Sequence, residues 1–335
     1  MTDTARDSAS GPGTSLTSQP IAEIHGLALS IAGREIVTRV DLDIAPGEGV
    51  GLVGESGSGK SVTCRSLIGL LGFIGATVTA GQIRIAGRDM TSASQREWQA
   101  LRGGTVSLVP QASLAALDPL IRVGAQLQEV VRRHDRGADT VARSLELLEQ
   151  VRMPTPKRVM RAYPHELSGG MRQRAMIALA IAGRPALLIA DEATTALDAT
   201  IQRSILQLLT SLRAELGMAL LLVSHDLSVI RSATDRVAVM YAGTIVERAA
   251  SREVFVRPRH PYTAGLTAAD PALVARGQRL RSLPGDPPQP GAWPPGCRFA
   301  PRCAYRQPRC EEALPPLIDH GGYAVACVRE TEISL

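Results

Sequence analysis

The sequence is poor in lysine, in aromatic residues and in long apolar runs. Lysine and arginine together number 37, yet lysine occurs only at positions 60 and 157. Aromatic residues make up 3% of the chain, and none precedes Phe73. No apolar run reaches the roughly 18 residues that a membrane-spanning helix needs. We therefore expect no transmembrane segment, and we expect the position of each lysine and each ring to be informative.

The remaining composition is typical of a soluble globular protein. The 335 residues are 44% hydrophobic and 21% charged, and this length allows one large and one small domain. The net charge of +5 is mild and the two signs are interspersed, so we expect no nucleic-acid partner. Residues 1–20 are polar and lack the apolar core of a signal peptide. They predict a disordered tail and a cytoplasmic protein.

One of the two lysines lies in a segment with strand, loop and helix character, Val50–Val62. Within it, the loop Gly54–Ser61 fits the phosphate-binding pattern G-x-x-x-x-G-K-[ST]. Glycines let the backbone turn its N–H groups toward an anion, and the start of a helix adds further free N–H groups. Lys60 supplies a compact charge for the terminal phosphates and Ser61 a hydroxyl for Mg²⁺. This segment predicts a nucleotide site.

The rest of the chain alternates strands and helices, which indicates an α/β domain over residues 21–256. We expect strands at Ile21–Ile31, Glu35–Ile44, Gly81–Ile85, Val106–Val109, Ala186–Ala190, Leu220–Val223, Val237–Tyr241 and Thr244–Arg248. We expect helices from the loop to about Leu71, at Val123–Arg133, at Val141–Val151, to about Gly183 and at Ile201–Leu216. Residues 112–165 have the apolar spacing of an inserted helical subdomain. Proline-rich segments and a change in composition place a boundary near residue 257.

Two further motifs carry chemistry in this context. Asp191-Glu192 ends an apolar strand, where one acid can hold Mg²⁺ and the next can orient or deprotonate an attacking water. A solvated strand end is the alternative for an acidic pair alone. Leu167-Ser168-Gly169-Gly170 opens a helix, whose free N–H groups suit an anion, although Ser-Gly-Gly alone usually marks a loop.

Taken in order, the motifs resemble those of ATP-binding cassette (ABC) ATPases over about residues 21–256. The resembling segments are Gly54–Ser61 (Walker A), Gln111 (Q-loop), Leu167–Met171 (signature), Leu188–Glu192 (Walker B), Ala196–Asp198 (D-loop) and His225 (switch histidine). The resemblance implies a P-loop NTPase fold of the ABC type. Such a fold has a parallel-sheet core, an antiparallel β subdomain and the inserted α-helical subdomain.

The resemblance also implies how the work is divided among the residues. Glu192 would be the general base and His225 would contact the γ-phosphate. ATP would be bound by Ser56, Gly57, Ser58, Gly59, Lys60, Ser61, Val62 and Gln111. Mg²⁺ would be bound through Ser61, Gln111 and Asp191. Ser168, Gly169 and Gly170 would face the ATP of a second ABC subunit, identical or sister, with Asp198 in the D-loop.

The sequence departs from the family pattern at two positions. Ile31 stands where such domains usually place an aromatic residue that stacks on adenine, and an aliphatic side chain offers no ring stacking. Ala193 stands where a proline often follows the glutamate, which changes the stiffness of the loop. We expect weak selection of the base from the first departure and no change of chemistry from the second.

The C-terminal segment, residues 257–335, resembles the extension of peptide-importer ATPases. The resemblance rests on Pro258–Thr263, on Gly296–Cys303 and on Gln202 after the D-loop. That branch serves dipeptides, oligopeptides and, in some members, nickel. It implies two transmembrane permease subunits, an extracytoplasmic substrate-binding protein and a peripheral location at the cytoplasmic face of the inner membrane.

Four of the five cysteines lie in this segment, at Cys297, Cys303, Cys310 and Cys327. In a cytoplasmic chain such a cluster favours metal over disulfides, although structural zinc prefers closer spacing. The resemblance implies a [4Fe–4S] cluster, with Zn²⁺ or free thiols as alternatives. We expect such a centre to shape this segment and to take no part in hydrolysis. Cys64 should be a packed helix residue, and His260 and His320 should lie in a turn and at the surface.

The motifs leave three candidate functions. The first is the ATPase subunit of an importer for short peptides, with nickel or another small solute as a variant. The second is a soluble ABC ATPase acting in DNA repair or on ribosomes, which usually carries two cassettes or a long insertion. The third is an interaction module without chemistry, against which Lys60, Asp191, Glu192 and His225 argue. The single cassette and the importer-like extension favour the first.

Overall fold

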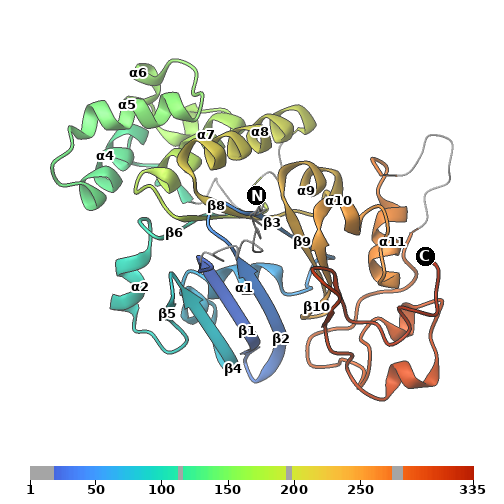
Figure 1. Cartoon of the computed structure of the whole chain (residues 1–335). Helices are drawn as coiled ribbons and strands as arrows, with labels where there is room; N and C mark the ends of the chain where they lie inside the picture. Colours follow the sequence, from blue (N-terminus) through green and yellow to red (C-terminus); the bar gives the residue numbers. More distant parts are fainter. Residues whose placement is uncertain (1–18, 112–115, 194–197, 274–281) are drawn as a thin grey trace, which may run out of the picture.

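The computed structural model describes residues 19–111, 116–193, 198–273 and 282–335, and it holds two sheets flanked by helices (Figure 1). The predicted disordered tail falls almost wholly outside the described residues. The larger sheet has eight strands in the order β11-β12-β10-β9-β3-β8-β7-β6. Its strands are β3 (Gly49–Val53), β6 (Val106–Val109), β7 (Leu187–Asp191), β8 (Ala219–Val223), β9 (Arg236–Tyr241), β10 (Thr244–Ala250), β11 (Ile318–Asp319) and β12 (Ala324–Val325).

The centre of this sheet is parallel, because β3 pairs in parallel with both β8 and β9, and β7 with both β6 and β8. Every residue of β3, β7 and β8 is buried, as the continuous apolar runs predicted. Successive side chains point to opposite faces. Leu187 and Ile189 therefore join one core, and Leu188 and Ala190 join the other.

A four-stranded antiparallel sheet covers the first face. Its order is β2-β1-β4-β5, with β1 (Ala22–Ile31), β2 (Arg34–Ile44), β4 (Ala76–Ile85) and β5 (Arg88–Asp89). Three helices precede or follow its last two strands in the sequence: α1 (Lys60–Ser66), η1 (Leu71–Ile74) and α2 (Gln95–Leu101). The predicted first helix extended to about Leu71, but α1 ends five residues earlier. The chain turns at Gly69, whose φ of +68° is left-handed.

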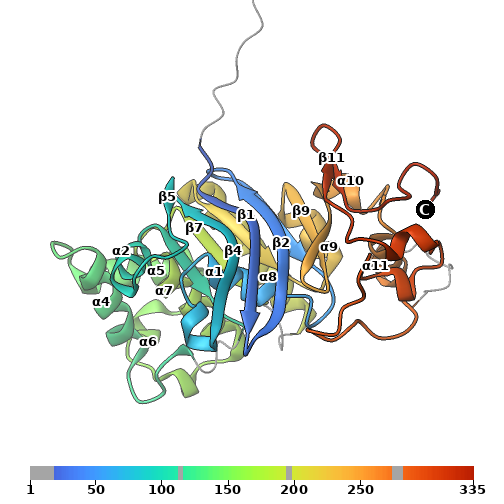
Figure 2. The same ribbon diagram turned by 90° about the horizontal axis from the view of Figure 1, so that it is seen from below.

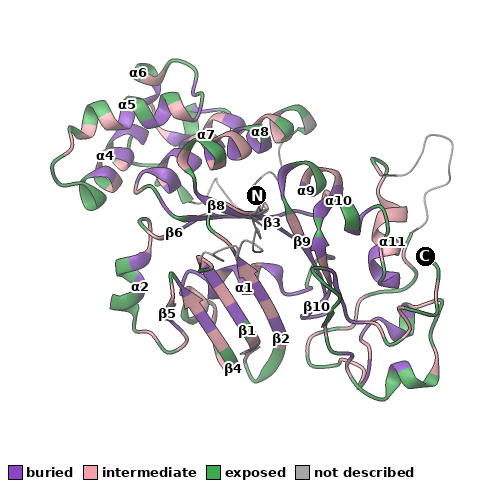
Figure 3. Ribbon diagram, in the orientation of Figure 1, coloured by how far each residue is buried: buried purple, intermediate pink, exposed green. Residues whose placement is uncertain are grey.

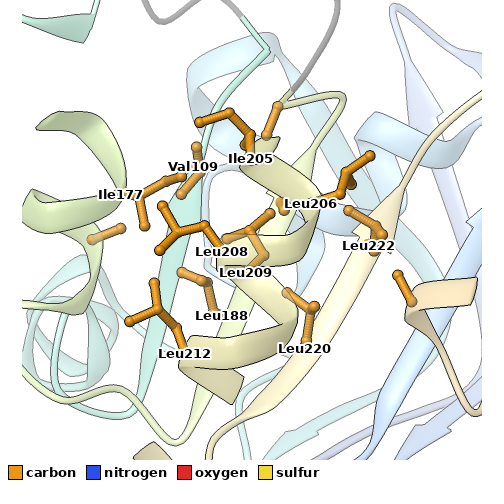
Figure 4. Packing of buried hydrophobic residues seen from close by; sticks show 14 of the residues in the cluster. Val109, Ile177, Leu188, Ile205, Leu206, Leu208, Leu209, Leu212, Leu220 and Leu222 are labelled. Atoms are coloured by element: carbon orange, nitrogen blue, oxygen red, sulfur yellow. The ribbon is translucent and has the colours of Figure 1, made fainter. Parts of the chain in front are cut away.

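Helices cover the second face. They are α4 (Val123–His134), α5 (Thr140–Gln150), α6 (Pro156–Val159), η2 (Pro164–Glu166), α7 (Gly169–Ile181), α8 (Ala199–Leu216) and α9 (Leu227–Ala233). Side-chain caps fix several of their starts, with Asp139, Ser168, Asp198 and Asp226 each accepting a backbone N–H. Figure 4 shows how α7 and α8 pack on the sheet through leucine and isoleucine side chains such as Ile177, Leu188 and Leu209. Figure 3 shows the buried strands between the two layers.

The C-terminal segment adds to the larger sheet. It follows the short helix α10 (Ser251–Val254) and contains α11 (Pro261–Ala269), η3 (Ala300–Arg302) and η4 (Pro308–Glu311). Its strand β12 pairs with β10. Tyr262 and Phe299 belong to the same apolar core as Tyr241 of β9. Figure 2 shows this segment and the helices α4 and α6 at opposite ends of the molecule. A separate Cys-rich domain is therefore not confirmed. Among the described helices, none is both long and apolar enough to cross a membrane.

Candidate functional site

The predicted site residues follow the carboxyl ends of four neighbouring parallel strands. The loop Gly54–Gly59 follows β3, Gln111 follows β6, Asp191 ends β7 and His225 follows β8. In a parallel sheet these ends lie along one edge, which is where ligands bind in open α/β folds. The topology thus gathers residues that are widely separated in the sequence.

The phosphate loop has the backbone that its glycines allow. Gly54, Gly57 and Gly59 have φ values of +151°, +78° and +103°. A Cβ atom at Gly54 would lie 2.0 Å from the carbonyl oxygen of Met240, so only glycine fits there. Gly59 is the left-handed cap from which α1 begins. The loop therefore leads directly into a helix start, as an anion site requires.

Lys60 is held inside this loop. Its Nζ atom donates to the carbonyl oxygens of Gly54 at 2.8 Å and Glu55 at 2.9 Å, and its exposed fraction is 5%. Burial lowers the pKa of Lys60, and the nearby carboxylates of Glu192 and Asp191 oppose that shift. The ammonium group thus sits between the loop carbonyls and two acids, the place from which it could reach terminal phosphates.

Four of the predicted residues are joined in two pairs. Ser61 Oγ donates to Asp191 Oδ1 at 3.0 Å, and Gln111 Nε2 donates to Glu192 Oε2 at 2.6 Å. Burial raises the pKa of Asp191, partly offset by the Ser61 hydrogen bond. The positive φ of Glu192, +47°, turns its side chain out of the strand direction. His225 lies exposed just beyond β8.

The signature and D-loop residues begin two other helices. Ser168 caps α7 by accepting the N–H of Met171 at 3.3 Å, and Asp198 caps α8 by accepting that of Ile201 at 2.9 Å. Gly170 lies so close to Ile201 that a Cβ atom would approach to 2.9 Å. Ala196 and Leu197 lie outside the described residues. No hydrogen bond of the described residues joins Ser168–Gly170 to the phosphate loop.

The four C-terminal cysteines line one small pocket, together with the buried His260. Burial raises the pKa of Cys303 and Cys327, and the backbone near Tyr305 and Arg329 offsets this only in part. Burial raises the pKa of Cys297 to about 11. Among the described residues, which include all four, no group of three or more acidic, histidine or cysteine side chains is arranged to hold a metal ion. A metal centre is therefore not confirmed.

Sequence reasoning missed the residues that attach the C-terminal segment. His260, expected in a turn, is 1% exposed and caps α11 by accepting the N–H of Tyr262 at 3.1 Å. The buried Glu247 of β10 accepts from the N–H of Arg259 at 2.5 Å and from the hydroxyl of Tyr323. Arg302 reaches the phosphate loop and pairs with Glu55 at 2.7 Å. His260 and Arg302 lie in segments that carry the importer resemblance, but the sequence does not indicate that His260 is buried or that Arg302 reaches a distant partner.

The sequence matches two known family profiles. The ABC transporter profile matches residues 37–195, and that of the oligopeptide/dipeptide transporter C-terminal region matches residues 246–310. A peptide import ATP-binding protein of Brucella melitensis is 43% identical over 319 residues, covering 93% of this chain and 96% of the relative. The chain belongs to the ABC transporter family. The oligopeptide transport ATP-binding protein AppD of Bacillus subtilis is 42% identical over 87% of this ABC ATPase and 90% of its own length.

Solved structures agree with this membership. The ATP-binding cassette MJ0796, a dimer in a post-hydrolysis state bound to ADP and Pi, is 28% identical. It matches with a TM-score of 0.62, covering 69% of this ABC ATPase and 99% of that chain. The uncovered part of this chain agrees with the presence of an extension beyond the cassette. The expected P-loop fold of the ABC type is confirmed.

Proposed function

We propose that this ABC ATPase is the ATP-hydrolysing subunit that powers an importer of dipeptides or oligopeptides. The observation that carries the proposal is the convergence of Lys60, Ser61, Asp191, Glu192 and Gln111 at one sheet edge. The similarity to peptide import ATP-binding proteins over almost the whole length supplies the transported class. The matched C-terminal region is the part that points to peptides in particular.

In this proposal the site residues take the roles that their contacts suit. Lys60 and the N–H groups from Ser56 to Val62 bind the phosphates. Ser61 and Asp191, already hydrogen-bonded, hold Mg²⁺ together with Gln111, and this ion would neutralise phosphate charge. Glu192 takes the proton of the attacking water, His225 contacts the γ-phosphate, and Gln111 links the nucleotide to Glu192. A carboxylate suits the proton transfer because it accepts a proton without needing to lose one first.

The proposal includes partners. The signature Ser168–Gly170 begins α7 and not the strand edge that carries the phosphate loop, and we propose that a second ABC subunit supplies the signature that completes the site. Asp198 would lie near that junction. Two transmembrane permease subunits and a substrate-binding protein would select and carry the cargo. This chain would then be peripheral, at the cytoplasmic face of the membrane.

A second part of the proposal concerns the four cysteines. Cys297, Cys303, Cys310 and Cys327 line one pocket, so four sulfur ligands for a single cluster come together there. We propose a [4Fe–4S] cluster, with a single zinc ion at the same thiols as the alternative. Its role would be structural.

Paired variants of the assembled transporter test the catalytic assignment. Glu192→Gln removes the base and spares the phosphate cradle, so it should bind MgATP and lower kcat by at least about a hundredfold. Lys60→Ala removes the cradle's cation, so it should weaken MgATP binding instead. Hydrolysis rates and binding of a fluorescent ATP analogue separate the two effects. Hydrolysis by Glu192→Gln at the wild-type rate would contradict the role of Glu192.

A further inference from the structure

Tyr262 and Arg302 of the C-terminal segment hydrogen-bond to one residue of the phosphate loop, Glu55. Glu55 occupies the second position of the loop, and all three of its polar groups are engaged. Its N–H donates to the hydroxyl of Tyr262 at 2.8 Å. Its carbonyl accepts from Lys60 at 2.9 Å, and its carboxylate accepts from Arg302. A residue of the ATP site is therefore held from outside the cassette.

The Arg302–Glu55 pair has the geometry of a strong ion pair. Two parallel hydrogen bonds join the groups, Nη1 to Oε2 at 2.7 Å and Nη2 to Oε1 at 2.9 Å. The Arg302 side chain is 6% exposed and that of Glu55 is 25% exposed. Arg302 is itself fixed, because Nε donates to the carbonyl of Pro284 at 2.7 Å and Nη1 reaches the Tyr241 hydroxyl at 3.2 Å. Bidentate arginine–carboxylate pairs fix the orientation of both groups and are stronger than hydrogen bonds between neutral groups.

The location of this pair matters because of the charge of the ligand. The Glu55 carboxylate belongs to the loop that binds a polyanion, and an unpaired carboxylate there would repel phosphates. A partly buried carboxylate that loses its partner is costly, because water replaces the lost interaction only in part. Arg302 cancels this charge and keeps the side chain directed away from the cradle, toward the C-terminal segment.

The cysteines bracket the residues that make this contact. Cys297 and Cys303 flank a segment in which Arg298 donates to Thr38 Oγ1 at 2.7 Å, Phe299 joins the aromatic core and Arg302 pairs with Glu55. Proline-rich residues 287–290 line a cavity with Glu55 and the loop as well. These contacts place the segment that carries two of the cysteines directly beside the phosphate loop.

We infer that Arg302 is a positioning residue for ATP binding, which acts by neutralising and orienting Glu55 of the phosphate loop. The inference rests on the proposed ATP-binding function and deepens it, because it makes the C-terminal segment a determinant of nucleotide affinity. It requires no direct contact between Arg302 and the nucleotide. The effect should appear in the dissociation constant for MgATP and in KM, with kcat at saturating ATP nearly unchanged.

A double-mutant cycle on the full-length chain tests the inference. Arg302→Gln should raise the Kd for MgATP about tenfold, the size expected when one partner of a partly buried charge pair is lost near a charged ligand. Glu55→Gln should bind at least as tightly as the wild type. Arg302→Gln combined with Glu55→Gln should recover affinity to within about threefold, because no unpaired carboxylate remains. Arg302→Lys keeps the charge but loses the two parallel hydrogen bonds, so its Kd should lie between those of the wild type and Arg302→Gln.

The matched control is Arg306→Gln. Arg306 lies in the same segment and pairs with Glu311, but that pair is about half exposed and lies outside the phosphate loop. The control should leave the Kd unchanged. If Arg302→Gln does not fold, Glu55→Gln and the double variant still decide, since tenfold weaker binding in either overturns the inference. Equal affinity of Arg302→Gln and Arg306→Gln for MgATP would also overturn the inference. A wild-type chain that does not bind MgATP would instead refute the proposed function.

Discussion

At the scale of single residues, the candidate site depends on contacts both near and distant in the sequence. Lys60, Ser61, Asp191 and Glu192 belong to short motifs, and a motif fixes its chemistry through a few adjacent positions. Glu55 belongs to the phosphate-loop motif, yet its partner Arg302 lies 247 positions away in the sequence. Nothing in either local sequence requires the pair, because only the folded chain brings the two side chains together.

Ile31 carries a prediction of its own. It is half-buried at the end of β1, where an aromatic ring would stack on adenine in the resembled pattern. We expect the wild type to prefer ATP over GTP by less than about tenfold, since an aliphatic side chain gives contact area without ring stacking. Ile31→Tyr should tighten ATP binding by about 0.5–1.5 kcal/mol. Titration with both nucleotides measures this, and Ile31→Leu is the control that adds no ring.

A wild-type preference for ATP of a hundredfold or more would contradict this expectation. It would mean that another side chain recognises the base. Trp293 would be the first to examine, because the C-terminal segment brings its ring against the Arg298 guanidinium and next to Gly243.

At the scale of elements, the spacing of apolar residues predicted the long and regular helices and strands. The buried parallel strands and the helices α4, α5 and α8 lie within a few residues of their predicted bounds, because a repeated apolar pattern identifies each. The two-residue strands β11 and β12 are too short to produce any pattern. Their pairing with β10 depends on the whole C-terminal segment, so the extension of the sheet could not be predicted.

The segment around the four cysteines gives an element-scale prediction. Anaerobically purified protein should be brown and contain about four iron and four sulfide per chain. Replacing any of Cys297, Cys303, Cys310 or Cys327 by Ser should remove the colour and make the C-terminal segment more sensitive to proteolysis, because a bound centre stabilises only the folded form. Cys64→Ser is the control, since that thiol lies buried in α1. Absorbance, metal analysis and limited proteolysis provide the readouts.

Two outcomes would count against this centre. Colourless anaerobic protein with one zinc per chain would exclude the cluster and keep a metal site. Protein with neither metal, and with four thiols that titrate freely, would exclude both and leave the cavity as an apolar feature of the fold.

At the scale of the whole molecule, the proposed function requires the phosphate loop and the signature of one chain to act on different nucleotides. The phosphate loop lies on the larger sheet and the signature begins α7 in the layer of helices (Figure 1). The similar cassette MJ0796 is a dimer, an assembly in which a second chain can supply the other signature. Motif order in the sequence indicated the need for a second copy, because one chain holds only one of each motif.

Activity should therefore depend on assembly. The isolated chain should hydrolyse ATP slowly at low concentration, and its specific activity should rise steeply with protein concentration or when partner subunits are added. Ser168→Arg places a bulky cation at the signature and should abolish this rise while leaving MgATP binding by the same chain intact. Mixing it with Glu192→Gln offers a sharper test. If both composite sites must act together, the mixture stays inactive, and if one suffices, activity returns through the site that pairs an intact Glu192 with an intact signature. Full activity in a dilute, verified monomer would contradict the shared site, because no second signature could then reach the nucleotide.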